Sequence, residues 1–281
     1  MAASTGDEEK NFRSTYYNKI GCKRADEKAV DKLLEEKPID INKLIQYVNK
    51  FGLTPCRRIV VWKTLLGIKS LTGEDDEYIS GIHKRVCDLL ESALCSMSLI
   101  DDKTKNNTKL LLMYILEVKD LSSDVEKQLS SQDNISFNAI ATSFDNFGFP
   151  FVDTYWLMRA FFYKLEEQKQ NIMKMAQKFT VDDKDLEKHL EETGAIDVLP
   201  ISVWFYRCFS GIIHDSCLVK IWDRLIANSF KALPLIARYI LLELKDSLLT
   251  KSSATEIRKT LLEPIQQTLS ETIVAQVLES K

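Results

Sequence analysis

Residues 204–225 read WFYRCFSGIIHDSCLVKIWDRL and hold two of the chain's four tryptophans and two of its six cysteines. Their apolar residues recur every three or four positions, which is the spacing of one face of an α-helix. The pattern predicts two successive core helices, with Asp215 as the cap of the second. The first apolar face consists of Trp204, Phe205, Cys208, Phe209 and Ile212, and the second of Leu218, Ile221, Trp222 and Leu225.

The same stretch also permits a metal-site interpretation, because Cys208, His214 and Cys217 are closely spaced. A structural zinc ion requires four ligands, usually with closely paired cysteines, and no second pair is nearby. Cysteine commonly behaves as a small buried apolar side chain. We therefore interpret the two cysteines as packing residues and expect neither a metal nor a cofactor. His83 and His189 fall on amphipathic helical patterns and are interpreted as ordinary surface or half-buried histidines.

Helical spacing continues along almost the whole chain. Nine glycines and six prolines in 281 residues favour long helices. Alternating strand patterns, glycine-rich phosphate loops and internal repeats are absent from the sequence, so a repeat solenoid is disfavoured. The sequence predicts an all-α protein of about a dozen helices. We expect a disordered acidic tail at residues 1–10 and one helical domain over residues 11–281.

Several polar residues stand where helices should begin. Asp40, Ser123 and Ser253 are predicted N-caps, the last two in capping boxes. The acidic runs at residues 74–77 and 182–185 lack the glycine and the spacing of a calcium loop. They are better explained as carboxylates near the positive ends of helix dipoles.

Composition restricts the class of protein. The formal net charge is −3 and no basic run is present, which argues against a nucleic-acid partner. The longest apolar run, near Leu110, has only about seven residues, so we expect no transmembrane segment. The start MAASTGDEEK lacks the apolar stretch of a secretory signal, and the cysteines include no CxxC pair. Together these features predict a cytoplasmic protein.

A second stretch, RIVVWKTLLG at residues 58–67, places Arg58 and Trp62 one helical turn apart. Together with residues 204–225 it resembles the opening and closing fingerprints of the TBC domain, the two-lobed helical fold of the Rab GTPase-activating proteins. The resemblance covers about residues 45–250 and departs from the family at Asn228 and Ser229, where a glycine is usual. It implies a structural fingerprint made of Arg58, Trp62, Gly67, Trp204, Phe209, Trp222 and Asp223.

Both catalytic motifs of that family are missing from this sequence. The family supplies a finger arginine from Ile-x-x-Asp-x-x-Arg and a water-orienting glutamine from Tyr-x-Gln. Here the nearest aspartate, Asp88, is followed three residues later by Glu91, and Tyr114 is followed two residues later by Leu116. An arginine finger accelerates GTP hydrolysis by roughly 10³- to 10⁵-fold. We therefore expect a pseudo-GTPase-activating protein without catalytic residues.

A narrower resemblance comes from NFRSTYYNKIG at 11–21 and DTYWLMRAFF at 153–162, together with the missing catalytic motifs. These features are similar to the non-catalytic TBC proteins that form the third subunit of the tuberous sclerosis complex. The resemblance implies binding to the C-terminal coiled coil of hamartin, with tuberin in the same complex. It also implies support of Rheb GTPase activation, restraint of TOR signalling, and a cytoplasmic location, peripheral on endomembranes or lysosomes.

Two questions stay open from the sequence. The Leu110–Val118 segment is apolar enough either to accept partner helices or to be buried on all sides. An active Rab GTPase-activating protein is the alternative function, with Arg85 or Lys84 supplying the missing positive charge.

Overall fold

The computed structural model describes residues 27–227 and 230–280. The proposed tail at 1–10, the motif at 11–21, Cys22 and the departure at Asn228–Ser229 lie outside the described residues. Within the described residues every regular element is helical, so the all-α prediction is confirmed. The elements are α2 (Glu27–Glu35), α3 (Ile41–Phe51), α4 (Pro55–Leu65), α5 (Asp76–Ser96), α6 (Asn106–Val118), α7 (Val125–Leu129), α8 (Gln132–Asn146), α9 (Phe151–Gln177), α10 (Lys184–Glu192), the 3₁₀ turn η1 (Ile196–Val198), α11 (Ile201–Tyr206), α12 (Asp215–Ala227), α13 (Leu233–Glu243), α14 (Lys245–Leu249), α15 (Ala254–Leu262) and α16 (Gln267–Glu279).

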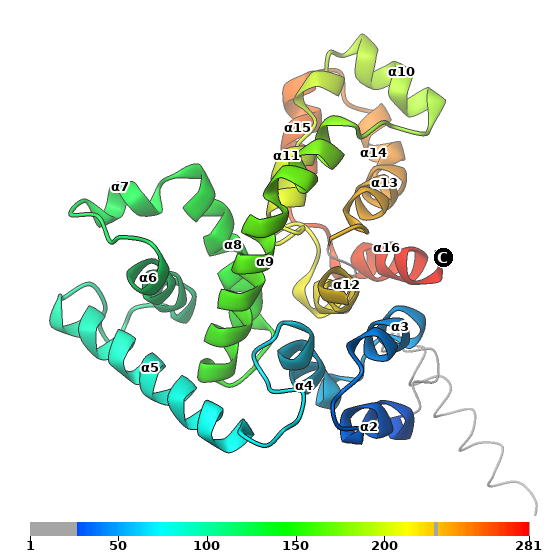
Figure 1. Ribbon diagram of the computed structural model, residues 1–281. Helices are drawn as coiled ribbons and strands as arrows, with labels where there is room; N and C mark the ends of the chain where they lie inside the picture. Colours follow the sequence, from blue (N-terminus) through cyan, green and yellow to red (C-terminus); the bar gives the residue numbers. More distant parts are fainter. Residues whose placement is uncertain (1–26, 228–229, 281) are drawn as a thin grey trace, which may run out of the picture.

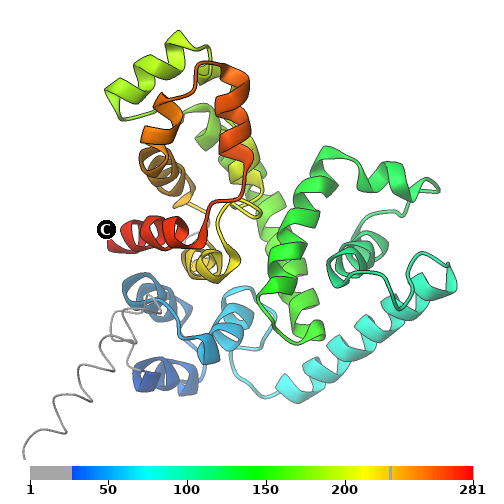
Figure 2. The same cartoon turned by 180° about the vertical axis from the view of Figure 1, so that it is seen from behind.

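Helix α9 runs through the middle of the molecule (Figure 1). Helices α5 to α8 lie on one side of it, and α10 and α13 to α15 lie on the other. The view from behind shows the same division (Figure 2). Helix α9 packs against α8, α5 and α4 and also against α11, so it belongs to the cores of both halves. Helix α12 packs against α3, α4 and α16 and thereby joins the beginning of the described chain to its end.

Helix α6 resolves one of the open questions. Its residues from Leu110 to Ile115 are all buried, and the helix packs between α5 and α8. A helix that is apolar on every side belongs in a core, since no face of it favours water. The Leu110–Val118 segment is therefore not an exposed docking helix. No helix in the described part of the chain is both long and apolar enough to span a membrane.

The predicted helix starts are mostly confirmed. The Asp40 carboxylate accepts hydrogen bonds from the backbone N–H groups of Asn42 and Lys43, and the Ser253 hydroxyl accepts one from Glu256. In the acidic run at 182–185, Asp183 caps α10. The prediction for Ser123 was wrong by one residue, because Asp124 is the N-cap of α7. Ser123 and Asp124 could each accept a hydrogen bond from a free N–H group of the first turn, and the Asp124 carboxylate accepts the one from Lys127.

The boundary between the two helices of residues 204–225 also differs from the prediction. Helix α11 ends at Tyr206, and the chain turns through left-handed conformations at Cys208 (φ 48°) and Phe209 (φ 63°). Asp215 is not a cap but the first residue of α12, and its carboxylate accepts a hydrogen bond from Asn146 Nδ2 at 2.7 Å. The expected apolar side chains are nevertheless buried, because the turn brings them back to the same core.

Candidate functional site

A buried ion pair joins α4 to α12. Arg58 Nε donates to Asp223 Oδ1 at 2.9 Å, and Arg58 Nη2 donates to Oδ2 at 3.0 Å. Trp62 Nε1 donates to Asp223 Oδ1 at 2.8 Å, one helical turn along α4. The side chains of Arg58 and Asp223 are only 6% and 2% exposed. Residues from the two fingerprint segments, 165 positions apart, therefore meet around one carboxylate.

The charges of this cluster stabilise the contact between α4 and α12. Burial raises the pKa of the Asp223 carboxyl, while the Arg58 guanidinium and the Trp62 N–H oppose that shift. Two parallel N–H···O bonds give the pair a defined orientation as well as attraction. Burying both charges costs free energy that only good hydrogen-bond geometry offsets. The cluster therefore fixes how α4 and α12 meet, and little of it is exposed to solvent.

The two remaining fingerprint tryptophans also satisfy their polar atoms inside the core. Trp222 Nε1 donates to the Cys208 carbonyl at 3.0 Å, and Trp204 Nε1 donates to the Leu261 carbonyl at 3.1 Å. Both rings are fully buried, as is Phe209. The seventh fingerprint residue, Gly67, lies just beyond α4 with φ 71°, a left-handed conformation that glycine adopts without strain. Six of the seven side chains are thus buried in the core, and Gly67 forms the turn after α4.

The cysteines and histidine of residues 204–225 do not form a metal site in the structure. Within the described residues no group of three His, Cys, Asp or Glu side chains is arranged to hold a metal ion. Cys208 and Cys217 are buried, and burial raises the pKa of both thiols. His214 Nδ1 lies 2.9 Å from the Ser216 hydroxyl, at the start of α12. The positions of the two cysteines agree with their interpretation as packing residues.

Burial separates the described cysteines into two groups with different reactivity. Cys56 and Cys95 are exposed, whereas Cys87, Cys208 and Cys217 are buried. Burial raises the pKa of Cys87 to about 12. We expect a thiol reagent at neutral pH to label Cys56 and Cys95 in the native protein and the buried three only after unfolding, because reaction needs an accessible thiolate. Peptide mass spectrometry measures this site by site. Labelling of native Cys208 at the rate of Cys95 would contradict the packing described above.

The outer face of α5 carries exposed apolar side chains. Tyr78 is 67% exposed, Ile82 is 37% exposed and Leu89 is 69% exposed. Their spacing places them on one side of the helix, while Cys87 and Leu94 on the opposite side are buried. We name Tyr78, Ile82 and Leu89 the α5 strip. A helix face of this kind is typical of surfaces that accept an amphipathic partner helix.

Comparison with known proteins gives relatives over nearly the whole chain. No protein-family model matches. TBC1 domain family member 7 of Bos taurus is 32% identical over 281 residues, which cover 98% of this chain and 95% of the relative. The Homo sapiens protein of the same name is 32% identical over 290 residues, with 98% and 95% covered. The Danio rerio protein is 34% identical over 248 residues, with 85% and 83% covered.

The chain belongs to the TBC domain family.

Two solved structures show that its fold is that of a Rab-GAP TBC domain. The Ypt/Rab-GAP domain of Gyp1p superposes with a TM-score of 0.60 at 14% identity, covering 89% of this chain and 94% of that one. The Chlamydomonas flagellar RabGAP TBC domain gives a TM-score of 0.59 at 13% identity, covering 100% and 97%. At this level of identity the likeness concerns the fold alone.

Helices α5 and α6 carry the residues whose spacing was compared with the TBC catalytic motifs. On α5, the Glu91 carboxylate lies 3.3 Å from Lys109 Nζ on α6, so it is ion-paired within the protein. Asp88 and Arg85 are exposed on the same helix, and Arg85 Nε points back to the Gly81 carbonyl at 3.4 Å. The exposed Lys84 precedes it.

The stretch compared with the Tyr-x-Gln motif lies toward the end of α6. Tyr114 is buried in the core, and burial raises its pKa to about 12. Leu116, two residues later, is half-buried. The next residue, Glu117, accepts hydrogen bonds from Tyr155 Oη and from Arg159 Nε, the latter at 2.7 Å. Sequence reasoning did not predict these ion pairs, because their partners lie on other helices.

Proposed function

We propose that this TBC domain is a non-catalytic subunit of the tuberous sclerosis complex that binds the C-terminal coiled coil of hamartin. The observation that carries the proposal is the carboxylate of Glu91, three residues after Asp88, which is paired with Lys109. Relatives named TBC1 domain family member 7 support the assignment to this branch of the family. In the complex, tuberin supplies the activating domain for Rheb, and this subunit supports that step and the restraint of TOR signalling. It acts in the cytoplasm, at endomembranes or lysosomes where the complex resides.

The charge at position 91 makes conventional GTPase activation unfavourable. An arginine finger stabilises negative charge that develops on the transferred phosphoryl group. A carboxylate at that place repels the phosphate oxygens. Its ion pair with Lys109 also directs the side chain toward α6. The half-buried Leu116 offers no amide to orient the attacking water.

The α5 strip is the surface that we assign to the hamartin coiled coil. Helix-on-helix recognition uses apolar anchors that recur along one side of a helix. Tyr78, Ile82 and Leu89 satisfy that spacing and are not covered by any other described element. The small residues Ser92 and Ala93 follow on the same side, so a partner helix can approach closely.

The binding experiment is a calorimetric titration of the full chain with a C-terminal coiled-coil fragment of hamartin from the same source. We expect submicromolar affinity for the wild type. Leu89→Asp should weaken binding by about 2–4 kcal/mol, since it places a charge in an apolar contact. The matched control is Leu262→Asp, on α15 at the other side of the molecule (Figure 1). No binding by the wild type would remove the proposal, and equal binding by both variants would remove the assignment to α5.

The catalytic alternative is tested with a panel of purified Rab proteins loaded with GTP. We expect no acceleration of hydrolysis by this protein, because neither catalytic group is present. The alternative instead requires acceleration of at least one Rab and its loss in Arg85→Ala, with Lys84→Ala as the neighbouring control. That result would establish an unconventional Rab GTPase-activating protein and overturn the non-catalytic assignment.

A further inference from the structure

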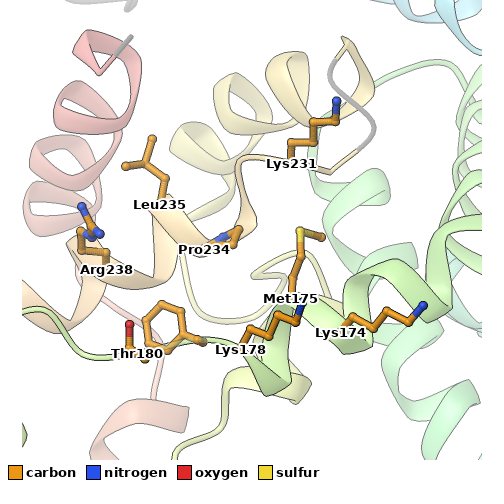
Figure 3. Close-up of a pocket in the computed structure, with 9 residues that line it drawn as sticks. Lys174, Met175, Lys178, Thr180, Lys231, Pro234, Leu235 and Arg238 are labelled. Atoms are coloured by element: carbon orange, nitrogen blue, oxygen red, sulfur yellow. The ribbon is translucent and has the colours of Figure 1, made fainter.

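A pocket of about 510 Å³ opens between the end of α9 and the start of α13. Four of its nine lining side chains are basic (Figure 3). Lys174 and Lys178 come from the last turn of α9 and the residue after it. Lys231 and Arg238 come from the facing segment that leads into and along α13. The lining therefore takes its cations from two parts of the chain that are about sixty residues apart, and all four of these residues are exposed to solvent.

The positive charge of this pocket is only partly balanced. None of the nine described residues that line it is acidic. Arg238 forms an ion pair with Asp182, which lies on the adjoining side. Within the described part of the chain Lys174, Lys178 and Lys231 form no ion pair. Three cations with no carboxylate opposite them favour an anionic ligand, because an anion relieves their mutual repulsion.

The helix dipoles explain the positions of the lysines at the end of α9 but not that of the lysine before α13. Lysines in the last turn of a helix commonly offset the negative end of its dipole, and Lys174 and Lys178 are placed to do so for α9. That explanation does not extend to Lys231. It precedes α13, where the positive end of the dipole should repel a cation. An anion bound near the first turn of α13 stabilises both the lysine and the helix end.

The apolar side chains of the pocket strengthen the attraction. The apolar part of the lining consists of Met175, Phe179, Pro234 and Leu235, and Thr180 completes it. Charges act over longer distances next to apolar walls than in open water, because the local dielectric constant is lower. The volume also falls within the range of small-ligand sites, roughly 300–1,000 Å³.

We propose that this pocket binds a small ligand carrying two or more phosphate groups. The spread of Lys174, Lys178, Lys231 and Arg238 around it suits several phosphates better than one. A soluble inositol phosphate and the headgroup of a phosphorylated inositol lipid share this chemistry. The pocket lies among the helices of the half opposite α5, so occupancy leaves the α5 strip free (Figure 1).

The test measures binding of inositol trisphosphate to the full chain by calorimetry. The pocket variant carries Lys178→Glu and Lys231→Glu. The control variant carries Lys103→Glu and Lys259→Glu, which change the net charge equally at exposed sites outside the pocket. We expect the pocket variant to lose about tenfold or more in affinity and the control to stay close to wild type, with both variants keeping the wild-type melting temperature.

A second arm identifies the source of the phosphates. The same three proteins are sedimented with phosphatidylcholine vesicles that contain phosphatidylinositol bisphosphate. Binding to vesicles as well as to inositol trisphosphate, lost only in the pocket variant, assigns a lipid headgroup. Binding to inositol trisphosphate alone assigns a soluble ligand. No binding of either probe by the wild type, or equal losses in the pocket and control variants, overturns the proposal. That failure would leave the hamartin titration unaffected.

Discussion

Replacement of Asp223 by alanine is expected to lower the free energy of unfolding by about 3–5 kcal/mol. The substitution leaves the Arg58 guanidinium in the core without its carboxylate, and it removes the acceptor of the Trp62 N–H. A buried charge that loses its partner costs far more than an exposed one, because water cannot replace the lost contact. Urea unfolding followed by circular dichroism measures the change.

The control for this variant is Glu192→Ala on α10, which removes one partner of an exposed ion pair with Lys188. A change within about 0.5 kcal/mol is expected there. The double variant Arg58→Met with Asp223→Leu should recover most of the loss, since it removes both buried charges together. A loss below about 1 kcal/mol for Asp223→Ala would show that the ion pair does not fix the contact between α4 and α12.

Replacement of Trp222 by alanine, as a separate variant, is expected to lower the free energy of unfolding by about 3–5 kcal/mol. The Trp222 ring stacks on Phe161 of α9 at 4.7 Å between centroids and lies 4.9 Å from Phe144 of α8. Its removal leaves a cavity where α8, α9 and α12 meet, and the surrounding helices close it only in part. Thermal and urea unfolding both report the loss.

Trp222→Phe separates packing from hydrogen bonding at the same position. Phenylalanine keeps an aromatic ring against Phe161 but gives up the hydrogen bond to the Cys208 carbonyl, a loss of about 1 kcal/mol before packing changes. The phenylalanine variant should therefore be clearly more stable than the alanine variant. Equal stability of the two would mean that the ring stacking contributes little.

Helical periodicity and end signals predicted the helices themselves well. Asp40 and Ser253 cap helices as expected, because a side-chain oxygen next to a free N–H is a local interaction that neighbouring residues determine. The end of α11 was missed for the opposite reason. The left-handed turn at Cys208 and Phe209 uses residues that do not favour it locally, and it is held by packing contacts from distant helices.

The candidate site was predicted only in part. The absence of the catalytic arginine and glutamine is a prediction from motif spacing, which is a local property. The sequence did not show that Asp223 binds Arg58, although a buried aspartate requires a partner. The α5 strip and the basic pocket were also missed. The strip alternates with charged residues along α5, and the pocket gathers lysines from α9 and from the segment before α13, which only the tertiary fold brings together.

The separation of Arg58 and Asp223 along the chain has a consequence for synthesis in the cell. The ribosome makes Asp223 165 residues after Arg58. At about 5–20 residues per second the nascent chain waits roughly 10–30 s before this contact can form. During that interval Arg58 and Trp62 on α4 lack Asp223, the α12 residue to which they donate hydrogen bonds in the folded protein. Until α12 has left the exit tunnel, the face of α4 that packs on α12 stays exposed, and a premature stop before Asp223 yields a chain that lacks this contact altogether.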